Sequence, residues 1–133
     1  MSYQHRNVGA LFKNAAAILP QTVADDASAQ SSVYQRNDPR LELSAKLIGM
    51  ADDSGGTATF TLEHSDASDG TFETVSGSTV EVADDSGEVD IDMSGLKAYV
   101  RINVDVVDDD GTDGADVAAT LVVGGASELP DVA

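Results

Sequence analysis

Hydrophobic and polar residues alternate in short runs along most of this chain, and the clearest run lies at residues 97–107. There Val100, Ile102, Val104 and Val106 are separated by Arg, Asn and Asp. A period of two places successive side chains on opposite faces of an extended strand. The run therefore predicts a strand with an apolar face toward a core and a polar face away from it.

Shorter runs with the same alternation, or with paired β-branched residues, predict further strands. They lie at residues 33–35, 41–47, 57–64, 71–75, 80–82, 89–93 and 117–123. Clusters of Asp, Ser and Gly between the runs predict turns. Short strands that recur every 8–12 residues or so are typical of an antiparallel sandwich or barrel. We therefore predict an all-β fold, an antiparallel β-sandwich over residues 32–125.

Residues 1–31 do not follow this alternation. Their apolar residues fall at a spacing compatible with a helix, and Pro20 would end a helix there. The residues concerned are Val8, Leu11, Phe12, Ala15 and Leu19. A short amphipathic helix and an extended arm both fit, so residues 1–31 are predicted to be an N-terminal arm or helix with a linker. Residues 126–133 are predicted to be a loose C-terminal tail.

Charge narrows the range of partners. The 133 residues suit one domain and carry 24 acidic against 7 basic side chains, a net charge of −17. Such a surface repels phosphate backbones and anionic lipid, so we expect neither nucleic-acid nor membrane binding. An Asp-rich, Lys-poor composition suits a halophilic protein, although a generally acidic soluble protein is the simpler reading. No apolar run is long enough to span a bilayer, and we see no signal peptide.

Candidate catalytic groups are few. The two histidines, His5 and His64, lie far apart in different kinds of segment, and no nucleophile motif accompanies either one. The absence of cysteine excludes thiol catalysis and thiolate metal sites. Gly55-Gly56 and Gly124-Gly125 are turn glycines rather than phosphate loops. We therefore predict no catalytic residues, no cofactor and no enzymatic activity.

Acidic loops raise the question of calcium, which prefers several oxygen ligands held in one turn. The weak candidates are Asp108, Asp110 and Asp113. The calcium-loop pattern fails, however. With Asp109 in the first position, Gly111 stands third, where a side-chain oxygen is needed, and Thr120 stands twelfth, where a bidentate Glu is needed. Exposed turns filled with Asp and Gly explain the sequence better than a calcium site does, so we predict no metal site.

Several stretches share their order and layout with one known family. They are Leu11-Phe12-Lys13-Asn14-Ala15-Ala16-Ala17, a Ser/Ala/Thr-rich link over residues 22–32, and the strand and turn at residues 59–66. Ala98-Tyr99-Val100-Arg101-Ile102-Asn103-Val104 and the last strand at residues 118–123 complete the set. In this the chain resembles small capsid decoration (cement) proteins of tailed prokaryotic viruses. The resemblance implies a jelly-roll-like sandwich that binds the major capsid protein, usually as a homotrimer, on the outer surface of the virion.

Two groups of residues are interface candidates under this hypothesis. Leu11, Phe12 and Leu19 would belong to an arm that contacts a neighbour or the shell. Tyr99 and Arg101 lie on the outward face of the clearest strand, for which simple solvent exposure is the alternative. Other virion roles, such as a head-fibre base, tail or adaptor protein, stay open, because function lies in the site rather than in the fold. A carbohydrate-binding module also stays open, although the chain has no Trp and only three Tyr to stack on sugars.

Overall fold

The computed structural model describes residues 13–36, 43–52, 56–108 and 114–124. Within these ranges the chain is built from strands, without a helix. The strands are β1 (Lys13–Val23), β2 (Ser28–Gln30), β3 (Tyr34–Gln35), β4 (Ser44–Ala51), β5 (Gly56–Ser65), β6 (Glu73–Thr74), β7 (Val80–Val82), β8 (Ser86–Asp92), β9 (Tyr99–Asp108) and β10 (Ala115–Gly124). The all-β prediction is therefore confirmed.

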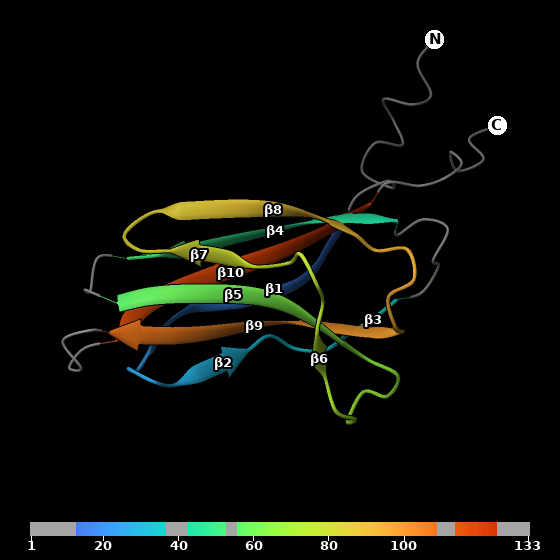
Figure 1. The fold of residues 1–133 in the computed structure, drawn as a ribbon, viewed down its shortest axis with the longest axis horizontal. Coiled ribbons are helices and arrows are strands. Elements are labelled where there is room, and N and C mark those ends of the chain that lie inside the picture. The colour runs from blue at the N-terminus through green and yellow to red at the C-terminus, as the bar shows by residue number, and fades with distance from the viewer. Residues whose placement is uncertain (1–12, 37–42, 53–55, 109–113, 125–133) are drawn as a thin grey trace, which may run out of the picture.

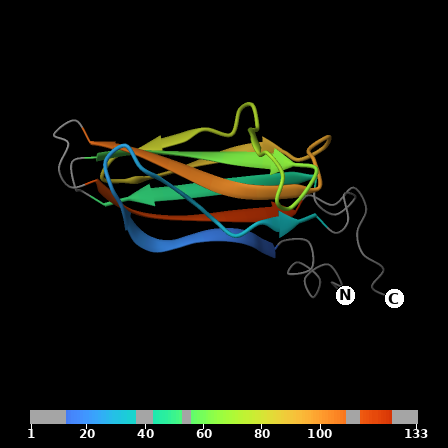
Figure 2. The same ribbon diagram turned by 90° about the horizontal axis from the view of Figure 1, so that it is seen from below.

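The strands form two antiparallel sheets that face each other (Figure 1). Sheet A has the order β1-β10-β4-β8, and sheet B has the order β2-β9-β5-β6, with β3 also paired to β9 and β7 to β5. Figure 2 shows the strands running along the length of the molecule, with the connections at its two ends. Most connections cross between the sheets, although β2 and β3, and likewise β5, β6 and β7, follow one another within sheet B. The orders β1-β10-β4-β8 and β2-β9-β5-β6 are those of a jelly roll.

One predicted connection differs from the structure. The Asp- and Gly-rich sequence of residues 108–114 predicts a hairpin between the last two strands, but β9 lies in sheet B and β10 in sheet A. The segment therefore crosses from one sheet to the other. Similar crossings join β4 to β5 and β8 to β9, and they place two groups of loops at opposite ends of the sandwich.

The core lies between the sheets and consists mainly of aliphatic residues, as the low aromatic content requires. The predicted inward face of β9 is confirmed, since Val100, Ile102, Val104 and Val106 are all buried. Ala45, Leu47 and Ala51 of β4 and Val117, Leu121 and Val123 of β10 oppose them from sheet A. Together these alternating faces bury the apolar side chains that make the sandwich stable.

Phe60 occupies the middle of this core and depends on a glycine across from it. Its ring is fully buried on β5 and lies directly over Gly49 of β4. A Cβ atom placed on Gly49 would lie 2.4 Å from Cδ1 of Phe60. Carbon atoms in contact are normally 3.5–4.0 Å apart, roughly, so the two sheets approach here only because Gly49 has no side chain.

The N-terminal prediction needs correction. Residues 13–23 form strand β1 at the edge of sheet A instead of a helix, and β2 lies in sheet B, so the sandwich begins well before residue 32. Two bulges explain the misleading pattern. Ala15 is extra between the pairs Asn14–Val122 and Ala16–Leu121, and Leu19 and Pro20 together stand opposite a single residue of β10. These insertions destroy the period of two by which a strand is recognised.

Candidate functional site

The outer faces of the two sheets differ in chemistry. On sheet B most of the outward side chains are polar, apart from Val107, and several bond to one another. Gln30 Nε2 donates to Asn103 Oδ1 at 2.7 Å, and Asn103 Nδ2 donates to Asp105 Oδ2 at 3.2 Å. Asn103 is only 7% exposed, so this part of the predicted solvent face is covered. A face whose donors and acceptors already have partners offers few unsatisfied groups to another molecule.

Arg101 is held within the same face. Its Nε donates to Glu63 Oε1 at 2.8 Å, and its guanidinium carbon lies 4.2 Å from the centre of the Phe72 ring. Both members of the ion pair are partly buried. Tyr99 lies at the start of β9, paired with Ser65 of β5 and half-buried. Arg101 therefore ties β9 to β5 and to the segment before β6, which is a structural role within the chain.

A small charged cluster lies at the same end of sheet B. Lys97 Nζ is 3.5 Å from Glu73 Oε2 and 3.8 Å from Asp66 Oδ2. His64 Nδ1 accepts a hydrogen bond from the backbone N–H of Lys97 at 3.2 Å. This bond fixes the imidazole near the end of β5, one residue before Ser65.

Sheet A presents a mainly apolar strip on its outer face. It consists of Ala17, Ile48, Met50, Ala118, Thr120 and Val122, which alternate with the buried residues of β1, β4 and β10. The strands bring these side chains together, since Thr120 pairs with both Ala17 and Ile48, and Ala118 pairs with Met50. Met50 is 50% exposed. A contiguous apolar strip on the surface of a strongly acidic protein is typical of a contact surface.

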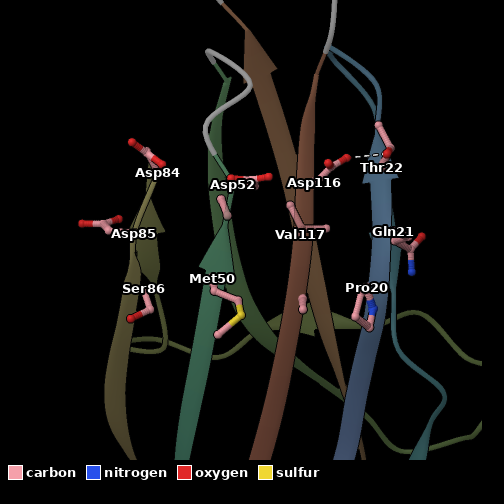
Figure 3. A pocket seen from close by; sticks show the side chains of 12 residues that line it. Pro20, Gln21, Thr22, Met50, Asp52, Asp84, Asp85, Ser86, Asp116 and Val117 are labelled. Carbon is pink, nitrogen blue, oxygen red and sulfur yellow. Dashed lines mark hydrogen bonds between the residues drawn. The ribbon is translucent and has the colours of Figure 1, made fainter.

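One end of this strip widens into a groove with a volume of about 840 Å³. It lies where β1 and β4 end and β8 and β10 begin (Figure 3). The lining residues are Pro20, Gln21, Thr22, Met50, Ala51, Asp52, Asp84, Asp85, Ser86, Asp116, Val117 and Ala118. Figure 3 shows Met50 below Asp52 and Asp116, with Asp84 and Asp85 to one side at the turn before β8. The groove thus combines an apolar floor with an acidic rim.

Local structure holds the rim carboxylates in place. The hydroxyl of Thr22 donates to Asp116 Oδ1 across the β1–β10 pair, drawn as a dashed line in Figure 3. Asp85 Oδ1 accepts from the backbone N–H of Ala83 at 3.2 Å, in a turn where Asp84 has a φ of 59°. Asp tolerates this left-handed conformation better than most residues, which suits it to the turn. The acidic groups are therefore positioned by the fold.

One carboxylate at the opposite end of sheet A, that of Asp92, has a shifted pKa. The side chain and backbone of Ser94 both donate to Asp92 Oδ1, at 2.7 and 2.9 Å. These bonds favour the charged form and lower the pKa of Asp92 below its ordinary value. The arrangement caps the end of β8 and does not form a reactive site.

The structure places the predicted site residues as follows. Leu11, Phe12, Asp110 and Asp113 lie outside the described residues, and Asp108 ends β9, with its backbone paired to Gly56. Leu19 is 73% exposed in the second bulge of β1. Among the described residues no group of three or more His, Asp or Glu side chains is arranged to hold a metal ion. The four candidates that can be placed do not converge on one site.

Sequence reasoning missed the groove. The strand predicted from the alternation ends at Leu47, whereas β4 continues to Ala51. Ile48 and Met50 then fall on the face that the pattern reserves for polar residues. Ile48 and Met50 on the outward face, with Asp52 two residues after Met50, are the signal that could have indicated a contact surface.

Comparison with known proteins gives a fold relationship. No family model matches the sequence, and no curated protein matches it. Among solved structures, the PBSX exported protein XepA is similar to this chain with a TM-score of 0.65 and 16% identity, over 92% of this chain and 39% of XepA. This chain therefore spans about two fifths of that protein. At such low identity the likeness establishes a shared β-sandwich fold.

Weaker likenesses exist to a pilus protein of Bacillus endospore appendages (TM-score 0.49, 15% identity, 87% of this chain and 89% of that one). A further weak likeness is to the CBM22-1–GH10 modules of Clostridium thermocellum xylanase 10B. Its TM-score is 0.42 at 9% identity, over 92% of this chain and 28% of that one. With TM-scores below 0.5, neither supports an argument about function.

In the described part of the chain, no helix is long and apolar enough to cross a membrane.

Proposed function

We propose that this chain is a non-enzymatic structural protein of a tailed virus that binds the outer capsid surface as a homotrimer. In this role it contacts the major capsid protein and stabilises the shell across the seams between capsomers. Linking three weak contacts in one oligomer makes the later contacts effectively intramolecular, so the assembly binds more tightly than any single contact.

The observation that supports this proposal most directly is the apolar strip of sheet A. A chain with a net charge of −17 has many acidic residues with which to cover its surface, yet it keeps Ile48, Met50 and Val122 on an outer face. Such a strip favours contact with another macromolecule over free solvent. The fold that the chain shares with XepA, which is itself described as an exported protein, agrees with a role outside the cytoplasm.

A count of copies per particle tests the proposal. Quantitative mass spectrometry of purified virions should find this chain in hundreds of copies, and cryo-electron microscopy should place it on the outside of the shell. A dozen copies or fewer would instead indicate a tail, portal or fibre position. Absence of the chain from purified particles would refute the proposal altogether.

The trimer is tested separately. Multi-angle light scattering of the purified chain should give a mass near three times 13.7 kDa. Substituting Ile48 or Val122 with Asp should weaken attachment to particles stripped of the protein, because a charge in a dry contact is costly. A matched substitution on sheet B, Thr61→Asp, should leave attachment unchanged.

A further inference from the structure

The groove at the end of sheet A has features that select for one kind of occupant. Its floor is formed by the Met50 side chain together with Pro20 and Ala118, all of them apolar. Met is unbranched and flexible, so it can adapt its shape to a partner. With about 840 Å³, the groove has room for a short stretch of peptide rather than a single side chain.

The rim determines the charge of that occupant. Asp52, Asp84, Asp85 and Asp116 line the groove, and none of the lining residues described by the structure is basic. Lys97 and Arg101 lie at the other end of the sandwich, paired with acids there. An anionic ligand would be repelled from this rim. A neutral sugar would lack a stacking surface, since the described lining is also without aromatic residues.

Lys and Arg side chains match both features at once. Their aliphatic stems bury against apolar surface while their charged ends stay at a polar rim. We propose that this groove binds a basic peptide segment of a partner protein, with a Lys or Arg stem on Met50 and the cationic group among the surrounding aspartates. The inference rests on the proposed function, because it assigns one docking surface to a chain that acts by binding other proteins.

The hydrogen bonds that Asp85 and Asp116 accept allow their charges to be removed while their positions are kept. In the double variant Asp85→Asn, Asp116→Asn the amide oxygens can still accept from Ala83 and Thr22, so charge is lost while geometry is kept. The matched control is Asp69→Asn, Glu81→Gln, which removes the same charge from exposed positions outside the groove. Met50→Ser removes the apolar floor. Thermal melting confirms that all variants are folded.

Isothermal titration with the synthetic peptide Gly-Lys-Leu-Arg-Leu-Lys-Gly measures the binding. We expect saturable binding by the intact chain and a loss of about tenfold or more in the Asp85, Asp116 double variant. Met50→Ser should also weaken binding, whereas the Asp69, Glu81 control should stay close to the original affinity. Raising salt from about 0.05 M to about 1 M should reduce the affinity without abolishing it, since the apolar contact is not screened.

Four results would overturn the inference. The first is no binding of the peptide, and the second is equal weakening by the control pair, which would mean general charge attraction. The third is equally tight binding of spermine that Met50→Ser does not affect, which would indicate a small polycation. The fourth is a groove variant that dissociates the chain's own oligomer, which would make a second copy the occupant. Because the titration uses the purified chain alone, its result is independent of whether the chain is found on virions.

Discussion

The contact between Gly49 and Phe60 makes a quantitative prediction about how the two sheets pack. In Gly49→Ala the new Cβ would lie 2.4 Å from Cδ1 of Phe60, so the ring or the strand must move by about 1 Å to restore normal contact. Overpacking of this kind costs about 1–3 kcal/mol. Ala also reduces the freedom of the unfolded chain, which offsets about 0.4–1 kcal/mol.

The net effect expected for Gly49→Ala is a loss of roughly 1–2 kcal/mol in the free energy of unfolding. For a domain of this size that lowers Tm by roughly 5 °C. Chemical denaturation followed by circular dichroism measures it. The matched control is Gly87→Ala on the neighbouring strand, directly paired with Gly49, where the new Cβ would meet only Val80 Cγ1 at 3.0 Å and Val82 Cγ1 at 3.1 Å. Those methyl groups can shift, so the loss should be smaller.

A double-mutant cycle completes the test. Phe60→Leu alone leaves a void and destabilises the protein, but in the Gly49→Ala background it makes room for the new methyl group. The two changes should therefore couple by about 0.5 kcal/mol or more. Strictly additive effects, or a larger loss in Gly87→Ala than in Gly49→Ala, would refute the packing argument.

Three further predictions follow from other described contacts. Ser78→Ala should cost about 1–3 kcal/mol in unfolding free energy, because the buried N–H of Leu62 loses its acceptor at 3.0 Å. Ser94→Ala should raise the pKa of Asp92 toward its ordinary value in an NMR titration. In the original chain, the stability that comes from the low pKa of Asp92 should be present above the pKa of the unfolded state. It should be lost as the pH falls through the pKa of the folded state. Deleting residues 1–12 should reduce attachment to capsids, because it removes the interface candidates Leu11 and Phe12 while keeping all of β1.

The following control variants and contrary outcomes separate these effects from general damage. Ser76→Ala, at an exposed position in the same turn region, should have little effect on stability. Deleting residues 1–19 should unfold the protein, because it removes more than half of β1, including Ala16 and Ile18 of the core. A tolerated deletion to residue 19 would contradict the place of β1 in sheet A. If the pKa of Asp92 did not change in Ser94→Ala, the Ser94 hydroxyl would be excluded as the cause of the lowered pKa.

The sequence predicted the regular strands well and the irregular one poorly. In β5 buried and partly exposed residues alternate from Gly56 to Glu63, and in β9 the buried apolar residues recur at every second position from Val100 to Val106. Both strands and their inward faces could therefore be predicted directly. In β1 the two bulges shift the inward positions, and the apolar spacing mimics a helix. Local pattern carries no information about such insertions, because they are fixed by pairing with a distant strand, β10.

The candidate site was beyond the same reasoning for a different reason. The groove gathers residues from four strand ends that are far apart in the chain, as Thr22 and Asp116 illustrate. The sequence shows each acidic turn separately, as a possible calcium loop. The structure instead brings Asp85 and Asp116, from different parts of the chain, to the rim of one groove. Which turns share an end of the sandwich follows from the strand order, and that order was not available from periodicity.

The edges of the two sheets have a consequence for solubility. Pro20 lacks an N–H and lies within a bulge of edge strand β1, while edge strand β8 carries exposed Glu88 and Asp90. Sheet B ends in strands of only two or three residues. Bulges, charges and short strands each prevent a foreign chain from adding to a sheet. Even in concentrated solution, the described strands should therefore resist amyloid-like polymerisation, and contacts between copies at these sheet edges should form through side chains.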